Sequence, residues 1–132
     1  EEPKNILVQE TIAENLSQID NTSDGETYAF TTLNLEEKEI EVLGEDIKSY
    51  VHLRNINLNK NQIKSIEELS VLEDLLILTA VENQIEDISF LAGEVNQKLQ
   101  ILNLSQNKIK SLSPITAPML KHLNLNENEI ES

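Results

Sequence analysis

The sequence predicts an α/β fold, namely a solenoid of right-handed repeat units. Parallel strands are expected on its concave face, short helical or 3₁₀ turns on its convex face, and a capping helix at its N-terminal end. The clearest unit occupies residues 53–74, LRNINLNKNQIKSIEELSVLED. Its first half alternates apolar and polar residues around Ile56 and Leu58, which indicates a half-buried strand. Its second half places apolar residues three apart, a spacing that suits a 3₁₀ or α-helical turn.

The same pattern recurs along the chain, which is the second observation behind this prediction. The next copies follow after 22 and then 24 residues, and a degenerate copy precedes the clearest one by 23. The repeated positions are Phe30, Leu33, Leu35, Lys38, Ile40 and Leu43; Leu75, Leu78, Ala80, Asn83, Ile85 and Ile88; Leu99, Leu102, Leu104, Asn107, Ile109 and Leu112; and Leu120, Leu123, Leu125, Asn128 and Ile130. This is the spacing of a leucine-rich repeat, whose units bury their apolar side only by stacking on one another.

An Asn recurs at one position of the repeat, as Asn61, Asn83, Asn107 and Asn128. Where the strand turns outward, its side-chain amide can bond backbone groups that no strand pairing satisfies. Losing such a partner costs about 1–3 kcal/mol. Lys38 holds this position in the first copy and cannot play that part while buried, so the first copy is predicted to be a capping repeat.

The chain is expected to divide into an N-terminal segment, residues 1–27, and a solenoid, residues 28–132. Ile12, Leu16 and Ile19 lie on one face of a helix predicted at about residues 9–19, which would cover the first core layer. The segment DNTSDGE then predicts a turn. It lacks the final Glu of a calcium loop, so no metal is expected. The solenoid comprises the capping repeat and about four further repeats, the last one incomplete.

The composition excludes several classes of function. The chain has 24 acidic and 10 basic residues, a formal net charge of −14, and no Cys. Binding to nucleic acid or to an anionic membrane by charge needs a positive surface, so neither is expected. Neither a membrane span nor a signal peptide is visible. The acidic surface has two open interpretations: it keeps the protein soluble, or it meets a basic partner.

The predicted binding site for a partner protein is the concave face. Its outward-facing residues are mostly Asn, but three of them are apolar, and these are interpreted as a docking patch or, alternatively, as packing noise. The partner-binding candidates are Asn55, Asn57, Asn59, Ile77, Thr79, Val81, Ile101, Asn103, His122 and Asn124. Leu123, Leu125 and Ile130 are expected to form an exposed C-terminal end, so the chain is expected to belong to a longer protein or to be covered there.

Catalysis finds no support in the sequence. His52 and His122 have no nucleophile or metal-ligand spacing around them. No Gly-rich phosphate loop is present, and acidic pairs such as Glu36 and Glu37 are typical of a solvated surface. The chain is therefore predicted to be no enzyme and to need no cofactor or metal.

Several segments resemble a family of leucine-rich-repeat proteins from the radial spokes of motile cilia and flagella. They are ETIAENLSQI, GETYAFTTLNLEEKEI, EDIKSYVHLRNINLNKNQI and APMLKHLNLNENEI. The resemblance covers roughly residues 10–132. It implies a cytoplasmic, axonemal scaffold that docks on neighbouring radial spoke subunits.

The repeat type also resembles the class found in phosphatase-1 regulatory subunits and the axonemal dynein light chain. An alternative function is therefore a soluble regulatory subunit that binds an enzyme, such as a protein phosphatase or a dynein motor domain. The Asn-rich concave face, which has no Trp or Tyr, weighs against a phosphatase regulator.

Overall fold

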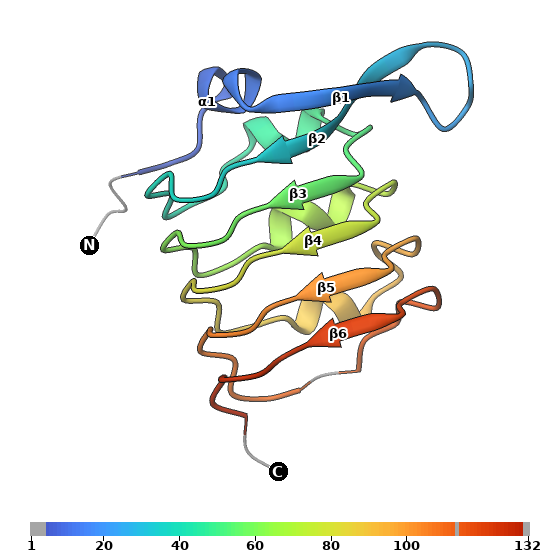
Figure 1. Ribbon diagram of the computed structural model, residues 1–132. Coiled ribbons are helices and arrows are strands. Elements are labelled where there is room, and N and C mark those ends of the chain that lie inside the picture. The colour runs from blue at the N-terminus through green and yellow to red at the C-terminus, as the bar shows by residue number, and fades with distance from the viewer. Residues whose placement is uncertain (1–4, 113, 131–132) are drawn as a thin grey trace.

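The computed structural model describes residues 5–112 and 114–130, and these fold as a stack of repeats (Figure 1). In chain order the elements are α1 (Gln9–Glu14), β1 (Leu16–Asn21), β2 (Tyr28–Asn34), the 3₁₀ helix η1 (Asp46–Ser49), β3 (Asn55–Asn57), η2 (Glu67–Val71), β4 (Ile77–Thr79), η3 (Ser89–Ala92), β5 (Ile101–Asn103) and β6 (His122–Asn124). The predicted leucine-rich-repeat solenoid is confirmed, and the connections opposite the strands are 3₁₀ helices.

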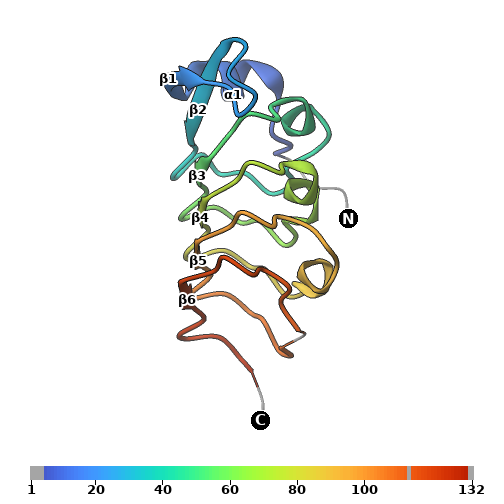
Figure 2. The same cartoon turned by 90° about the vertical axis from the view of Figure 1, so that its right-hand side faces the viewer.

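The strands form one sheet in chain order, β1-β2-β3-β4-β5-β6. β2 to β6 are parallel and in register, whereas β1 is antiparallel to β2. Seen from the side, the strands line one side of the stack and the 3₁₀ helices line the other (Figure 2). Each repeat therefore crosses from the sheet to the helical side and back, and its apolar side chains meet those of its neighbours in between.

The apolar core fills the interior between sheet and 3₁₀ helices as a single cluster. Most predicted repeat positions are buried within it, including Ile56, Leu58, Ile63 and Ile66 of the clearest copy. Two predicted repeat positions are corrected: Phe30 and Leu112 are exposed. Phe30 lies on the outward-facing side of β2, between the more buried Ala29 and Thr31.

The recurring Asn side chains tie each repeat to the one before it. Asn61 Oδ1 accepts hydrogen bonds from the backbone N–H groups of Lys38 and Ile40, both at 3.0 Å. Its Nδ2 donates to the carbonyl oxygens of Leu35 and Leu58, both at 2.9 Å. The same bonds recur at Asn83, Asn107 and Asn128. Each side chain accepts a hydrogen bond from a backbone N–H of the preceding repeat and donates to carbonyl oxygens of its own and the preceding repeat. The turn thus has its polar backbone groups satisfied inside the stack.

The N-terminal cap differs from the prediction of one helix over about residues 9–19. The α-helix ends at Glu14, and Leu16–Asn21 forms β1 instead. The first half of β2 extends past the three-residue β3, so only β1 is placed to pair with its backbone. This pairing outweighs the helical spacing of the apolar residues. Ile12 still covers the core as predicted, but Ile19 is exposed.

Candidate protein-binding surfaces

The predicted partner-binding residues lie on the sheet face, meaning the outward-facing side of β2 to β6. The parallel register places them in rows that run across the repeats. One row is Asn55, Ile77, Ile101 and His122, and the next is Asn57, Thr79, Asn103 and Asn124. His122 is exposed and the others are partly exposed, as are Asn59 and Val81 just beyond the strands. The structure therefore brings all ten candidates onto one surface.

An apolar cluster occupies the middle of this face. Ile77 and Ile101 are direct partners on neighbouring strands, and both side chains are half-buried. Leu76 and Val81 on the same repeat are also half-buried. We refer to Leu76, Ile77, Val81 and Ile101 as the sheet-face cluster. Its half-buried side chains rest against the stack and leave part of their surface for contact with another molecule.

The Asn side chains around this cluster are held in place by local hydrogen bonds. Asn57 Oδ1 accepts from the N–H of Asn59 at 2.9 Å, and Asn103 Oδ1 accepts from the N–H of Ser105 at 3.1 Å. Asn124 Oδ1 likewise accepts from the N–H of Asn126 at 2.9 Å. Such bonds give a partner to a backbone N–H group just after each strand and fix the direction of each side-chain amide. The sheet face is therefore a fixed polar surface around an apolar centre.

The C-terminal end of the stack carries further exposed apolar side chains. Leu123 is 44% exposed and Ile130 is 37% exposed, whereas Leu125 is half-buried. Sequence reasoning missed Met119, which is also exposed near this end. A shallow hollow of about 440 Å³ lies where this end meets the sheet face, between β5 and β6, and Ile101, His122 and Leu123 are among its lining residues.

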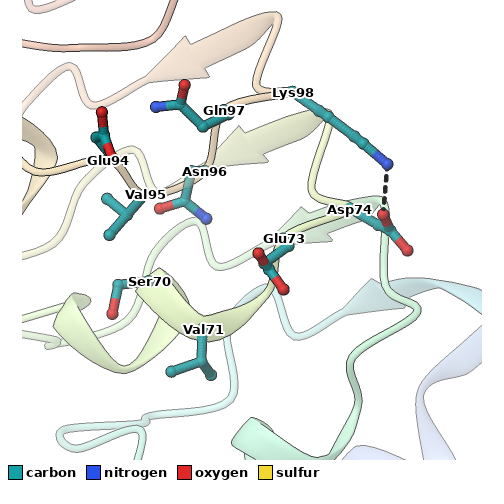
Figure 3. Close-up of a pocket in the computed structure, with 9 residues that line it drawn as sticks. All are labelled: Ser70, Val71, Glu73, Asp74, Glu94, Val95, Asn96, Gln97 and Lys98. Carbon is teal, nitrogen blue, oxygen red and sulfur yellow. Dashed lines mark hydrogen bonds and ion pairs between the residues drawn. The ribbon is translucent and has the colours of Figure 1, made fainter.

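A second hollow, of about 520 Å³, lies between η2 and the loop before β5 (Figure 3). Its lining residues are Ser70, Val71, Glu73, Asp74, Glu94, Val95, Asn96, Gln97 and Lys98. The buried Asn96 donates through Nδ2 to the carbonyl oxygens of Leu69 and Leu72, at 3.0 and 3.2 Å, and so anchors the loop to η2.

An ion pair closes one end of this hollow, since Lys98 Nζ lies 2.8 Å from Asp74 Oδ1. Burial alone would raise the pKa of Asp74, but hydrogen bonds from Lys98 and Ser23, with the charges of Lys98 and Arg54, outweigh it and lower the pKa below its usual value. Asp74 therefore stays ionised and paired at neutral pH.

Known proteins resemble this chain in sequence and in structure. No protein-family model matches the chain. Among curated proteins, leucine-rich repeat-containing protein 23 from Homo sapiens is 29% identical over 126 residues, which is 94% of this chain and 35% of that protein. The Bos taurus protein of the same name is 28% identical over the same shares. The chain thus spans about a third of the length of the curated relatives it matches.

Solved structures agree on the fold. Internalin C2 of Listeria monocytogenes has a TM-score of 0.71 and 31% identity, covering 77% of this chain and 44% of that one. A chain in the Drosophila melanogaster SNF/U2A′ complex has a TM-score of 0.73 over 96% of this chain and 72% of that one, at 21% identity. The chain has the leucine-rich-repeat fold. Such similarity implies a scaffold for protein–protein interaction.

The described part of this leucine-rich-repeat chain contains no cluster of side chains suited to metal binding. No group of three or more His, Asp or Glu side chains that could hold a metal ion occurs among residues 5–112 and 114–130. His52 and His122 lie on different repeats, and Nδ1 of His52 is buried without a hydrogen-bond partner there. In the same part of the chain, no helix is long and apolar enough to span a membrane.

Sequence reasoning also missed an apolar surface at the N-terminal end of the repeat stack. Ile19, Tyr28 and Phe30 are exposed on the antiparallel β1–β2 hairpin. A signal for this hairpin exists in the sequence, because the turn DNTSDGE separates two segments and the second, YAFTT, is rich in aromatic and β-branched residues. The spacing of Ile12, Leu16 and Ile19 obscured it.

Proposed function

We propose that this chain is a non-catalytic structural scaffold subunit of the ciliary or flagellar axoneme, within a radial spoke. It docks neighbouring spoke proteins through its sheet face and its C-terminal end, and its location is cytoplasmic, in the axonemal cytoskeleton. The observation that carries this proposal is the continuity of the two surfaces. The sheet-face cluster reaches β5, and the hollow between β5 and β6 connects it to the exposed Leu123.

The chemistry of these surfaces supports a protein partner. Protein interfaces combine an apolar centre, which loses its contact with water, with a polar rim that makes hydrogen bonds. Here Ile77 and Ile101 form the centre, while Asn57, Asn103 and Asn124 form part of the rim with their amides already fixed. Because these side chains have little freedom left to lose, the entropic cost of binding is reduced.

The absence of enzymatic activity is part of the proposal. A catalytic site needs a nucleophile or base held in a pocket with a partner that adjusts its pKa. Asp24, Asp74 and Asp87 are the groups whose pKa is clearly shifted in the described residues, and all three are shifted downward by hydrogen bonds. A carboxylate with a lowered pKa is a poor proton donor or acceptor near neutral pH.

Similarity to leucine-rich repeat-containing protein 23, over 94% of the chain, supports the choice of the radial spoke over other scaffolds. The resemblance of GETYAFTTLNLEEKEI and SYVHLR to radial spoke proteins supports it further. The competing role is a regulatory subunit that binds an enzyme such as a protein phosphatase or a dynein motor domain. Both roles use the sheet face, so only the identity of the partner separates them.

Cross-linking mass spectrometry on detergent-washed axonemes tests the proposal. Lys60, Lys108 and Lys121 are exposed, and each lies close to the end of a strand. Cross-links from these lysines to radial spoke subunits are expected. Lys48, on η1 and paired with Glu45 at 3.1 Å, is the internal control and should give fewer links. If the protein instead washes out with the membrane–matrix fraction and links to an enzyme, the proposal is wrong.

A further inference from the structure

The antiparallel hairpin at the N-terminal end carries the two most exposed large apolar side chains of the described residues, Tyr28 at 70% and Ile19 at 64%. Phe30, on the same hairpin, is 45% exposed. The whole sequence has only two Tyr and two Phe, so half of its aromatic residues lie here. We refer to Ile19, Tyr28 and Phe30 as the hairpin patch. Exposed apolar residues that gather on one element mark an interaction surface more often than scattered ones.

The three side chains share one face of the hairpin. Along β2, exposed residues alternate with more buried ones, so Tyr28 and Phe30 point to the same side as Thr32. Ile19 is the direct antiparallel partner of Phe30, and direct partners lie on the same face. Thr32 in turn pairs with Asn55 of the sheet face. The hairpin patch is thus an extension of the sheet face beyond the ends of the short strands.

Local hydrogen bonds hold this hairpin in one shape. At its tip, Thr22 Oγ1 donates to Asp24 Oδ1 at 2.6 Å, and the N–H of Gly25 donates to the carbonyl oxygen of Thr22 at 2.8 Å. Beside the turn, Arg54 reaches across from the next repeat. Its Nη1 lies 3.3 Å from Asp20 Oδ2, and its Nη2 donates to the carbonyl oxygen of Asn21. A surface that is already ordered loses little entropy when a partner binds.

The hairpin patch lies within a strongly acidic segment of the chain. Residues 5–37 contain seven acidic residues and no Lys, Arg or His; the acidic residues are Glu10, Glu14, Asp20, Asp24, Glu26, Glu36 and Glu37. The hydrogen bond from Thr22, with that from the N–H of Glu26, lowers the pKa of Asp24, so this carboxyl is ionised at neutral pH. Two basic residues before β3 lie near the turn end of the hairpin: Arg54 is already paired with Asp20, and the charge of His52 adds to the lowering of the pKa of Asp24.

The face of the hairpin is better suited to a partner than its edge. β1 is the outer strand of the sheet, and a free edge can in principle accept an added strand. Two features oppose this. Gln18 has a positive φ of 59°, which interrupts the regular strand, and Asp20 places a charge on it. Local distortion and charge are the devices by which proteins protect edge strands.

We propose that the hairpin patch docks a basic amphipathic segment of a partner protein. Apolar side chains of that segment cover Ile19, Tyr28 and Phe30, while its Lys or Arg side chains face Asp24 and Glu26. This inference goes beyond the proposed function, because it adds a second docking surface at the opposite end of the stack from Leu123. Electrostatic attraction favours a basic partner and repels anionic membranes and nucleic acid.

Two synthetic peptides test this inference with the full 132-residue chain. One is a helical peptide of Leu and Lys with all leucines on one face, and the other has the same pattern with Glu in place of Lys. Binding is followed by fluorescence anisotropy, and the contact surface is mapped by backbone amide chemical shifts. We expect saturable binding of the Leu/Lys peptide, at least tenfold weaker binding of the Leu/Glu peptide, and shifts centred on residues 17–32.

A triple variant, Ile19→Ser with Tyr28→Ser and Phe30→Ser, should weaken binding of the Leu/Lys peptide at least tenfold. The matched control is Val51→Ser with Val71→Ser, which removes side chains of similar exposure, 45% and 44%, from outside the hairpin and the sheet face. It should bind as the unchanged chain does. Tyr28→Lys, at the most exposed position, gives a second readout should the triple variant fold poorly.

Four results would overturn the inference. The first is unchanged binding by the triple variant or by Tyr28→Lys. The second is equal binding of the two peptides. The third is a set of shifts centred on β4 to β6, because the peptide would then occupy the sheet face instead of the hairpin. Binding to phosphatidylcholine vesicles in place of the peptide would likewise count against a protein partner.

Discussion

The two ends of the repeat stack differ in how far the side chain at one shared repeat position is exposed. Leu33, Ile56, Leu78, Leu102 and Leu123 are direct partners along the sheet. The first four are at most 3% exposed, whereas Leu123 is 44% exposed. The residue type hardly changes along this row, so the burial of each side chain depends on what covers it. Near the N-terminal end a cap covers the row, and at the described C-terminal end no repeat does.

In the N-terminal cap, two buried apolar side chains cover the first core layer. Ile12 on α1 is fully buried, and Leu7 is nearly so. The N–H of Leu7 donates to the carbonyl oxygen of Val42 at 2.9 Å, which ties the start of the chain to the first repeat. A solenoid needs such a cap because its terminal units would otherwise expose a core layer. The difference between the two ends therefore predicts three contrasts in stability, each smaller than the one before it.

Placing a charge at the shared repeat position should separate the middle of the stack from its end. Leu78→Asp buries an unpaired carboxylate and is expected to unfold the chain, because the cost exceeds about 4 kcal/mol and approaches the whole stability of a small domain. Leu123→Asp should remain folded, because water reaches this position. Circular dichroism and thermal melting measure both. A folded Leu78→Asp variant would contradict the repeat register.

Truncating the cap should be costly only where the cap is buried. Ile12→Ala removes a fully buried side chain and is expected to lower the free energy of unfolding by about 2–4 kcal/mol. Ile19→Ala, on the exposed face of β1, should change it by less than about 0.5 kcal/mol. Urea denaturation of the two variants provides the comparison. Equal effects would mean that α1 does not seal the stack.

Removing one recurring Asn should also cost more inside the stack than at its end. Asn61→Ala leaves several buried backbone groups without a partner and is expected to cost about 2–3 kcal/mol. Asn128 makes an equivalent set of bonds, but it is partly exposed, so water can replace its amide. Asn128→Ala should cost about 1 kcal/mol or less. Denaturant midpoints of both variants test this, and the reverse order would contradict it.

Much of the fold could be predicted because the spacing of apolar residues in each repeat determines which side chains pack inside the stack. A strand with period-2 alternation followed by apolar residues three apart can bury Ile56, Leu58 and Ile63 only in a stack, and they are buried there. The recurring Asn could be placed for the same reason, since its amide serves the same turn in every repeat. The outward-facing residues of the sheet follow from the alternation alone.

The hairpin could not be predicted in the same way, because it occurs once and has no copy to confirm it. Ile12, Leu16 and Ile19 fit a helical face as well as they fit a helix followed by a strand. The deciding factor is non-local, since β2 is longer than β3 and needs a second neighbour for its first half. Phe30 was assigned to the core by its place in the pattern, yet its orientation depends on that pairing.

We propose that the repeats that build the core also leave Ile77 and Ile101 available for a partner. The double variant Ile77→Asp with Ile101→Asp tests it most directly, with retention in detergent-washed axonemes and thermal melting measured side by side. We expect a folded protein that is lost from the washed axonemes, because both side chains are partly exposed and their strands stay paired. A variant that unfolds, or one that is folded and fully retained, would contradict the claim.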